Sequence, residues 1–159
     1  LLLSGSMNAS VSNGGFEAGD LTDWLAEGAD IAVELNDLGP YHVKIVAPEA
    51  QNPFIKQDRL GEGGVTAGKA ITVSFDMKGV SSDGGVVVAQ LLTESPAGVS
   101  KTDPLTTTVP PADWQNFSFP VTVGDNPEWG VSLTLQPVCG AVAGCEVTAY
   151  FDNVVITVD

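Results

Sequence analysis

The chain has 159 residues, enough for one domain, and 43% of them are hydrophobic, which excludes a disordered acidic tail. Its net charge of −14, from 20 acidic and six basic residues, excludes a surface that follows nucleic-acid phosphates or lies on an anionic bilayer, because both need clustered cations. No run of about 18 apolar residues is present, so no membrane span is predicted. We expect a monomer with neither a nucleic-acid nor a membrane partner.

The first seven residues, Leu1–Met7, are too short for a signal peptide and are interpreted as a cloning remnant, which leaves residues 8–159 as one domain. The 18 Gly and ten Pro, together with plentiful Val and Thr, are typical of turn-rich all-β proteins. Short apolar or alternating runs bounded by turn residues predict nine strands. These are Asp30–Leu35, Tyr41–Ala47, Phe54–Arg59, Ala70–Lys78, Gly85–Thr93, Leu105–Val109, Gln115–Val123, Trp129–Gln136 and Glu146–Val158.

The clearest alternation is in Ala70–Lys78, where Ile71, Val73, Phe75 and Met77 share one face, which predicts a strand buried on one side only. Most prolines fall between the predicted strands and mark their boundaries. Such a set of strands predicts an all-β sandwich of two antiparallel sheets, either immunoglobulin-like or a jelly roll. The pattern alone does not choose between the two.

Two further features are read from the sequence alone. Pro120 lies inside a predicted strand, which predicts an edge strand or a bulge there. Cys139 and Cys145 flank a short Gly-containing turn, so a disulfide that closes a hairpin tip is geometrically easy. The alternative is two unpaired cysteines in a cytosolic protein, and the composition, which looks secreted, favours the disulfide.

The two ends of the chain carry a family resemblance. The segment Asn13-Gly14-Gly15-Phe16-Glu17, followed by Gly19-Asp20-Leu21 and Asp23-Trp24, resembles the opening of carbohydrate-binding modules of families four, sixteen and twenty-two. The last predicted strand, Ala149-Tyr150-Phe151-Asp152-Asn153-Val154-Val155-Ile156, resembles their closing strand. The resemblance extends from about Asn13 to Val158 and implies a β-jelly roll from a secreted glycoside hydrolase or polysaccharide lyase. It also implies a glycan-binding cleft on the concave sheet.

The resemblance further implies a structural Ca²⁺ ion that joins the first strand to the last. Carried over by position, Glu17 and Asp152 supply carboxylates, and Asn13 and Gly39 supply backbone or amide oxygens. Several oxygen ligands are what this hard cation prefers. The alternative is that Glu17 and Asp152 merely cap turns, as exposed acids usually do.

Sugar recognition needs aromatic faces for the C–H side of the ring and polar groups for the hydroxyls. Trp24 and Trp114 stand at positions that are structural in the resembled families. Phe54 is the first candidate for the sugar, because it begins a strand that also carries Lys56, Gln57 and Arg59 and that the family comparison puts across the concave sheet.

Four more residues complete the predicted ligand site. Gln90 interrupts an apolar run, and since a buried amide without a partner is costly, it is expected to open onto a groove. Thr134 and Gln136 lie on the polar face of their strand. Trp129 follows a polar turn and can lie at the cleft rim, although its phase with the next apolar residues equally suits the core.

The resulting hypothesis is a non-catalytic, extracellular module that binds a polysaccharide and holds a catalytic domain of the same polypeptide near it. The negative charge favours neutral chains such as β-glucan or xylan, unless Lys56, Arg59, Lys78 and Lys101 converge. One alternative is a structural or adhesive cell-surface domain.

The other alternative is a small jelly-roll lyase or glycosidase. It could use Asp58 and Asp76 as acids, or Tyr41 with His42 as a base pair. No motif joins these residues, and a fold alone says nothing about chemistry.

Overall fold

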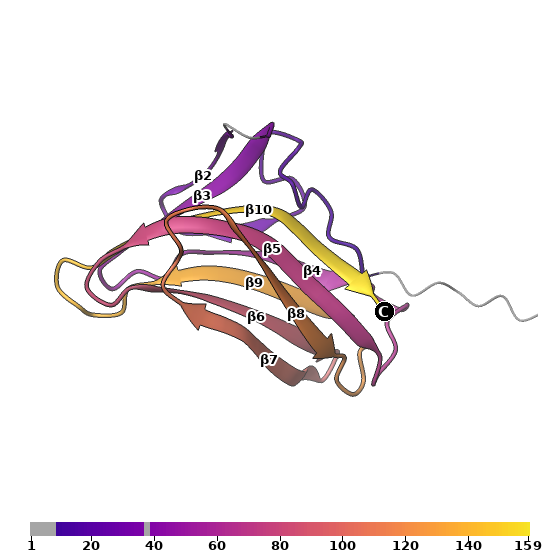
Figure 1. The fold of residues 1–159 in the computed structure, drawn as a ribbon. Coiled ribbons are helices and arrows are strands. Elements are labelled where there is room, and N and C mark those ends of the chain that lie inside the picture. Colours follow the sequence, from indigo (N-terminus) through magenta and orange to yellow (C-terminus); the bar gives the residue numbers. More distant parts are fainter. Residues whose placement is uncertain (1–8, 37–38) are drawn as a thin grey trace, which may run out of the picture.

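A computed structural model describes residues 9–36 and 39–159, so the expected cloning remnant, Leu1–Met7, lies outside the described residues. Within the described residues, ten strands form two antiparallel five-stranded sheets that pack face to face (Figure 1). Sheet A has the strand order β1-β4-β9-β6-β7, and sheet B has the order β2-β3-β10-β5-β8. This is the expected all-β sandwich. The described part of the chain has no helix that could cross a membrane.

Each of the nine predicted strands overlaps an observed one. The observed strands are β1 (Leu25–Glu27), β2 (Ile31–Leu35), β3 (Tyr41–Pro48), β4 (Phe54–Leu60), β5 (Ala70–Ser81), β6 (Val86–Ser95), β7 (Gly98–Thr108), β8 (Gln115–Thr122), β9 (Val131–Val138) and β10 (Glu146–Val158). Strand β1 was not predicted, and β7 begins at Gly98 rather than at Leu105. Trp129 precedes β9 rather than beginning it.

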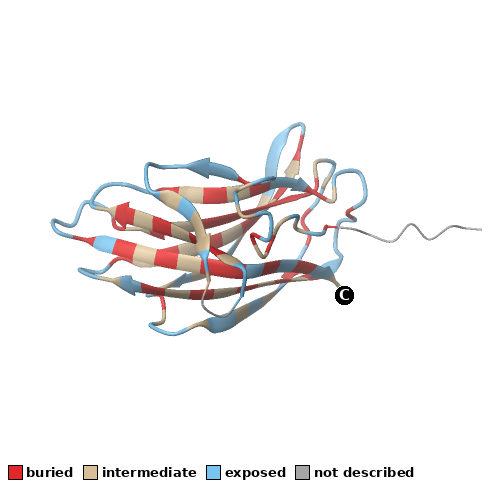
Figure 2. Cartoon of the chain, turned by 90° about the horizontal axis from the view of Figure 1, so that it is seen from above, coloured by how far each residue is buried: buried red, intermediate tan, exposed pale blue. Residues whose placement is uncertain are grey.

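The core lies between the sheets and follows the alternation of the sequence. Figure 2 shows buried residues alternating with less buried ones along the strands. In β5, Ile71, Val73, Phe75 and Met77 are all fully buried, as predicted. The Phe75 ring lies at the centre of an aromatic cluster, 5.9 Å from each of three other phenylalanine rings. Those rings belong to Phe117, Phe119 and Phe151, so the cluster joins β5, β8 and β10.

Proline marks the edges of both sheets. Pro120 lies in β8, which is an edge strand of sheet B, as predicted. Pro104 was expected at a strand boundary, but it lies within β7, the edge strand of sheet A, opposite Gln90 at an irregularity in the register. An edge strand tolerates proline because one side of its backbone needs no ladder hydrogen bond.

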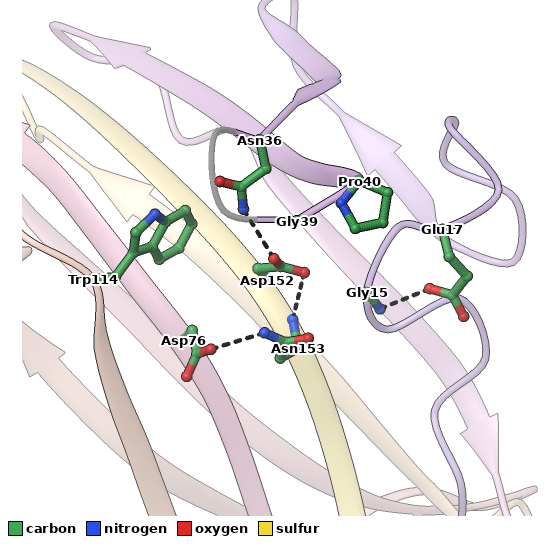
Figure 3. A pocket seen from close by; sticks show the side chains of 9 residues that line it. All are labelled: Gly15, Glu17, Asn36, Gly39, Pro40, Asp76, Trp114, Asp152 and Asn153. Carbon is green, nitrogen blue, oxygen red and sulfur yellow. Dashed lines mark hydrogen bonds between the residues drawn. The ribbon is translucent and has the colours of Figure 1, made fainter.

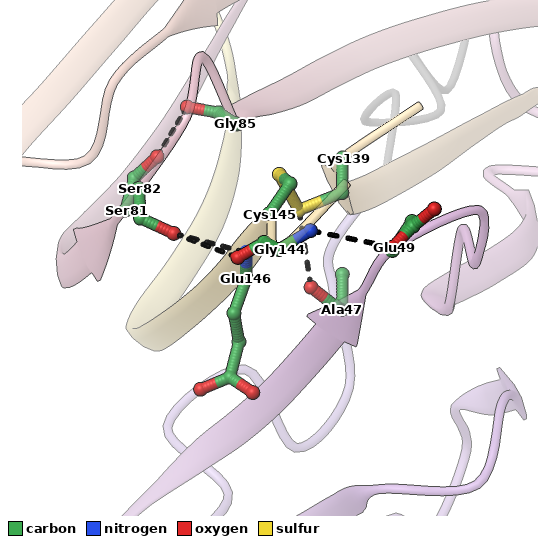
Figure 4. The surroundings of a disulfide bond; sticks show 9 residues. All are labelled: Ala47, Glu49, Ser81, Ser82, Gly85, Cys139, Gly144, Cys145 and Glu146. Atoms are coloured by element: carbon green, nitrogen blue, oxygen red, sulfur yellow. Dashed lines mark hydrogen bonds between the residues drawn. A yellow bond between two sulfur atoms is a disulfide. The ribbon is translucent and has the colours of Figure 1, made fainter. Parts of the chain in front are cut away.

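The Cys139–Cys145 disulfide is present, as predicted (Figure 4). The prediction that it closes a hairpin is wrong, because β9 belongs to sheet A and β10 to sheet B. The disulfide therefore constrains the loop that carries the chain from one sheet to the other. The backbone amide of Gly144 in that loop also donates to the Glu49 carboxylate, at 3.3 Å, which holds the loop against the end of β3.

The N-terminal segment, residues 9–24, packs against both sheets. Gly14 has no room for a side chain, because an added Cβ would lie 2.0 Å from the Val154 carbonyl oxygen of β10. The Gly14 carbonyl accepts from the Val154 amide at 2.8 Å. Phe16 is fully buried and stacks on Trp24, whose indole N–H donates to the Asn13 carbonyl at 3.1 Å. Trp24 is therefore structural, as expected.

The aromatic cluster predicts a large effect of truncating its centre. Phe75→Ala is expected to lower the free energy of unfolding by about 3–5 kcal/mol, because it removes a buried ring and leaves a cavity. Guanidinium denaturation measures this difference. The control is Leu35→Ala, where the side chain is 76% exposed and the change is expected to stay within about 0.5 kcal/mol. Equal effects of the two substitutions would contradict the position of the core.

Candidate functional site

The outer face of sheet A collects most of the residues predicted to bind a ligand. The register places Lys56 of β4 opposite Thr134 of β9, and Thr134 opposite Gln90 of β6. Residues directly opposite each other share a face of the sheet, so these three side chains form a continuous row. The row runs from Leu25 on β1 to Pro104 on β7, and we call it the central row.

A second row lies beside the central row. Phe54 is opposite Glu27 of β1, and Gln136 of β9 is opposite Val88 of β6. The register of β4 with β9 places Phe54 next to Gln136. The Gln136 side-chain amide donates to the Asn52 carbonyl at 2.9 Å, which fixes its orientation. A partly exposed aromatic ring therefore stands beside an oriented amide.

The polar side chains of the central row differ in their availability. Thr134 is largely buried, at 8% exposure, and lies at the floor of the face. Gln90 is half-buried, while Ala89 and Leu91 on either side of it are in the core. Its side-chain amide makes no hydrogen bond within the described part of the chain. This amide can therefore bond to the hydroxyl of a bound molecule.

Two acidic side chains form ion pairs with Lys56 of the central row. The Lys56 ammonium lies 2.8 Å from the Asp58 carboxylate and 3.8 Å from the Glu94 carboxylate. The buried Ser132 hydroxyl donates to the other oxygen of Glu94. The cluster therefore holds one cation between two carboxylates and presents mainly hydrogen-bond acceptors.

Trp129 and Arg59 form a pair at the end of this face. The Arg59 guanidinium lies 4.0 Å from the centre of the Trp129 ring and 3.0 Å from the Glu62 carboxylate. The Trp129 backbone amide donates to the Glu94 backbone carbonyl at 3.0 Å, which places this residue beside the end of β6. Trp129 is half-buried and lies outside the core. Of the two alternatives left open by the sequence, the core is therefore excluded, and a position at the rim of a cleft stays a prediction.

Gln57 is separated from the other predicted ligand residues. It points toward the interior, is 4% exposed, and its amide is fully used. Its carbonyl oxygen accepts from the Ser12 amide at 2.8 Å, and its nitrogen donates to the Ser12 carbonyl at 2.9 Å. This side chain ties β4 to the N-terminal segment and is not available to a ligand on the outer face.

Sequence reasoning missed two residues of this face. Leu25 is 56% exposed on β1, a strand of three residues that is too short for its alternation to be recognised. Glu94 continues the outward phase of β6 beyond Gln90 and Leu92. Its place on the face could have been predicted from that phase, because alternate residues of a strand share a face.

Three of the four predicted metal ligands line a single cavity. Glu17, Gly39 and Asp152 surround a space of about 510 Å³ on the outer side of sheet B (Figure 3). Polar and aromatic side chains that were not predicted complete its lining. These are Asn36, Asp76, Trp114 and Asn153.

The oxygens of this cavity gather around Gly15. A Cβ added to Gly15 would lie 3.1 Å from Glu17 Oε2, 3.8 Å from Asp152 Oδ1 and 3.9 Å from Asn153 Oδ1. Asn153 has a left-handed backbone at a register shift of β10, which lets it follow Asp152 without continuing the alternation. Two carboxylate oxygens and one amide oxygen therefore lie within 3.9 Å of one point beside Gly15. Among the described residues, no group of three or more His, Cys, Asp or Glu side chains is placed to hold a metal ion.

The surroundings of Asp152 shift the pKa of its carboxyl. Burial raises the pKa of its carboxyl above the usual range, and the nearby Asp76 carboxylate acts in the same direction. Hydrogen bonds from the Asn153 amide, at 2.7 Å, and from the Asn36 side chain, at 3.1 Å, oppose this shift. The folded protein thus holds a carboxylate that would gain from a positive partner.

Asn13 is placed differently from the other predicted metal ligands. Its side-chain nitrogen donates to the carbonyls of Asp20 and Thr22, each at 3.0 Å, and its side-chain oxygen accepts from the Ala18 amide. Its carbonyl accepts from Trp24. Asn13 does not line the cavity and instead organises the turn that presents Glu17.

The fold is shared with solved carbohydrate-binding modules. The match to TmCBM61 in complex with β-1,4-galactotriose covers 97% of this chain and 100% of that chain, at 18% sequence identity and a TM-score of 0.63. The match to the CBM22-1 xylan-binding domain of Paenibacillus barcinonensis Xyn10C covers 95% of this chain and 94% of that chain, at 15% sequence identity and a TM-score of 0.64. The active domain of bacteriophage CBA120 tailspike protein 4 matches 96% of this chain, at 14% identity and a TM-score of 0.68, but the match spans only 22% of that chain.

No sequence among curated proteins matches the chain. The family model described as a carbohydrate binding domain matches residues 8–137. This match spans most of the chain, includes the opening segment that begins at Asn13, and agrees with the family named from the sequence. The chain therefore belongs to this family of carbohydrate-binding domains.

Proposed function

We propose that the outer face of sheet A is the glycan-binding surface of this domain. The observation that carries the proposal is the central row, in which Lys56, Thr134 and Gln90 lie side by side across three strands. Phe54 supplies an aromatic face next to the row, and Trp129 pairs with Arg59 near the beginning of β9. A row of hydrogen-bonding groups beside apolar rings suits an extended sugar chain, whose rings have both C–H faces and hydroxyls.

The ligand of this face is a neutral polysaccharide. The cations on and near it do not converge, because Lys56 is paired with two acids, Arg59 with Glu62, and Lys101 with Asp103. No unpaired positive charge is left to attract an anionic chain to the described part of this face. Xylan is named for one structural relative and β-1,4-galactotriose for another, so xylan and the corresponding polymer, β-1,4-galactan, are the first ligands to test.

The domain acts without catalysis, as a targeting module of a secreted enzyme. Hydrolysis of a glycosidic bond needs two carboxylates that face the substrate with space between them. The Asp58 and Glu94 carboxylates instead have the Lys56 ammonium between them. Binding one part of a polypeptide to a polysaccharide raises the local concentration of substrate around an attached catalytic domain. The disulfide suits an oxidising, extracellular location.

A structural Ca²⁺ ion in the cavity beside Gly15 completes the proposal. Glu17 and Asp152 would supply carboxylate oxygens, Asn153 an amide oxygen and Gly39 a backbone oxygen. The ion would neutralise acids that the fold brings together and would join the N-terminal turn to β10. Its effect is on stability, since the cavity is on the outer side of sheet B and the proposed glycan face is the outer side of sheet A.

The glycan face predicts a specific loss of affinity. Phe54→Ala and Gln90→Ala are each expected to weaken binding to xylan or galactan about tenfold or more, because each removes a stacking surface or a hydrogen bond of about 1.4 kcal/mol. Affinity gel electrophoresis measures this loss. The matched control is Gln115→Ala, which removes an exposed glutamine from sheet B and is expected to leave affinity unchanged.

A second variant separates binding from folding. Gln57→Leu is expected to lower the free energy of unfolding by about 1–3 kcal/mol, because it leaves the Ser12 backbone groups unpaired, while affinity is retained. Undiminished binding of Phe54→Ala and Gln90→Ala, with wild-type stability, would show that the ligand uses another surface.

The calcium site predicts a metal-dependent melting temperature. At a calcium concentration about 100 times the dissociation constant, the wild type gains about 2.7 kcal/mol and melts roughly 5–10 °C higher than in chelator. Asp152→Asn is expected to remove this gain, and Asp125→Asn, an exposed acid outside the cavity, to keep it. Differential scanning calorimetry with calcium and with chelator measures both. Equal melting of the wild type in the two conditions would exclude the site.

A further inference from the structure

The outer face of sheet B carries a second cluster that the proposed glycan face does not use. The register places Tyr150 of β10 between Lys44 of β3 and Lys78 of β5. Trp114 directly precedes β8, whose first residue is opposite Met77, so its indole lies next to Lys78. Trp114 was expected to be structural, but it is half-buried on the outer face and outside the core.

Ring contacts fix the geometry of this cluster. The Lys78 ammonium lies 5.1 Å from the centre of the Trp114 ring and 5.2 Å from that of Tyr150, and so stands between two aromatic side chains. The His42 ring contacts both aromatic rings. Its centre lies 5.8 Å from that of Trp114 and 5.1 Å from that of Tyr150, with an edge-on arrangement against Tyr150. The His42 side chain is 8% exposed, and its Nδ1 has no hydrogen-bond partner among the described residues.

The charges around the cluster leave one cation available. Glu34 is engaged by His42 Nε2 at 3.4 Å and by Lys44 Nζ at 3.7 Å. Lys56, Arg59 and Lys101 each have their own carboxylate partner, and Lys69, which has none among the described residues, is exposed in the loop before β5 and does not line the cavity beside Lys78. Lys78 has no carboxylate at ion-pair distance within the described residues, although the chain has 20 acidic residues. This ammonium is therefore free to meet an external anion.

A cavity of about 360 Å³ adjoins the ammonium, within the size range of small-molecule pockets. It is lined by Glu34, His42, Lys78 and Tyr150, and its rim has two exposed apolar side chains, Leu35 and Val80. The cavity thus offers an aromatic and aliphatic surface, a carboxylate acceptor and one unpaired cation. A hexuronate sugar has the matching set of groups: an apolar C–H face, hydroxyl donors and one carboxylate.

We propose that this cavity is a second carbohydrate site, which binds a hexuronate residue of an acidic glycan through Lys78. The sugar ring lies against Tyr150 and the apolar rim, its hydroxyls donate to Glu34, and its carboxylate pairs with the Lys78 ammonium. The proposal does not rest on the glycan face of sheet A, because it uses residues of the opposite sheet. The two sites therefore bind independently.

The test is a titration of the ¹⁵N-labelled protein followed by NMR. D-galacturonate is compared with D-galactose, which differs only in having a hydroxymethyl group in place of the carboxylate, and with acetate, which has the carboxylate without the ring. Galacturonate is expected to shift the amides of Lys78, Gly79, Val80 and Tyr150, with at least tenfold higher affinity than either control. Tetragalacturonate is expected to shift the same amides.

Matched lysine variants complete the experiment. Lys78→Met is expected to weaken galacturonate binding at least tenfold, and Lys78→Arg, which keeps the charge, to weaken it less. Lys69→Met removes an exposed lysine from the loop before β5 and is expected to change nothing. Phe54→Ala and Gln90→Ala are expected to keep galacturonate binding, and Lys78→Met to keep neutral-glycan binding.

Four outcomes would overturn the proposal. These are the absence of shifts at the named amides, equal affinity for galactose, equal affinity for acetate, and unchanged galacturonate binding in Lys78→Met. Equal affinity for acetate would identify a general carboxylate site, such as one for an acidic peptide, rather than a sugar site.

Discussion

A glycine turn without room for a side chain is the constraint on which both outer faces depend. Gly14 lies so close to Val154 that only a glycine fits, and the same N-terminal segment reaches sheet A through the Ser12 bonds to Gln57. One short irregular segment is thus fastened to a strand of each sheet. The sandwich is held together at this end by backbone contacts as well as by its apolar core, and the position of Glu17 beside β10 follows from this fastening.

The same fastening concentrates negative charge. Glu17, Asp76 and Asp152 line one cavity, in a chain that already has a large negative charge. Amide donors from Asn36, Asn153 and Gly15 offset part of this repulsion. Natural sequences accept such a local conflict mainly at functional sites. The outer faces of the two sheets also differ in chemistry. Sheet A presents ion pairs and amides. Sheet B presents acids on one side of Trp114 and, on the other side, Lys78 with Tyr150 and His42.

The sequence predicts strands well where they are long and buried on one face only. The alternation of β5 correctly identifies its inward face. The register shift of β10 after Asp152 was not predicted. β1 could not be found, because three residues carry no periodicity. The inward orientation of Gln57 follows from its alternation with Ile55, but its polar side chain suggested a ligand role. The two hydrogen bonds with the Ser12 backbone explain why an amide is buried there. The cluster around Lys78 depends on the neighbours of β10, which no local pattern specifies.

The prolines of the edge strands have a consequence for crowded conditions. An exposed edge strand offers free backbone groups with which a second molecule can pair, and proteins avoid this with proline, inward charges and bulges. In sheet A, β7 has Pro104, register irregularities and the lysine–aspartate pair of Lys101. In sheet B, β8 has Pro120. The β7 and β8 edges are therefore poorly suited to pairing with the edge strand of a second copy, even where molecules are crowded together.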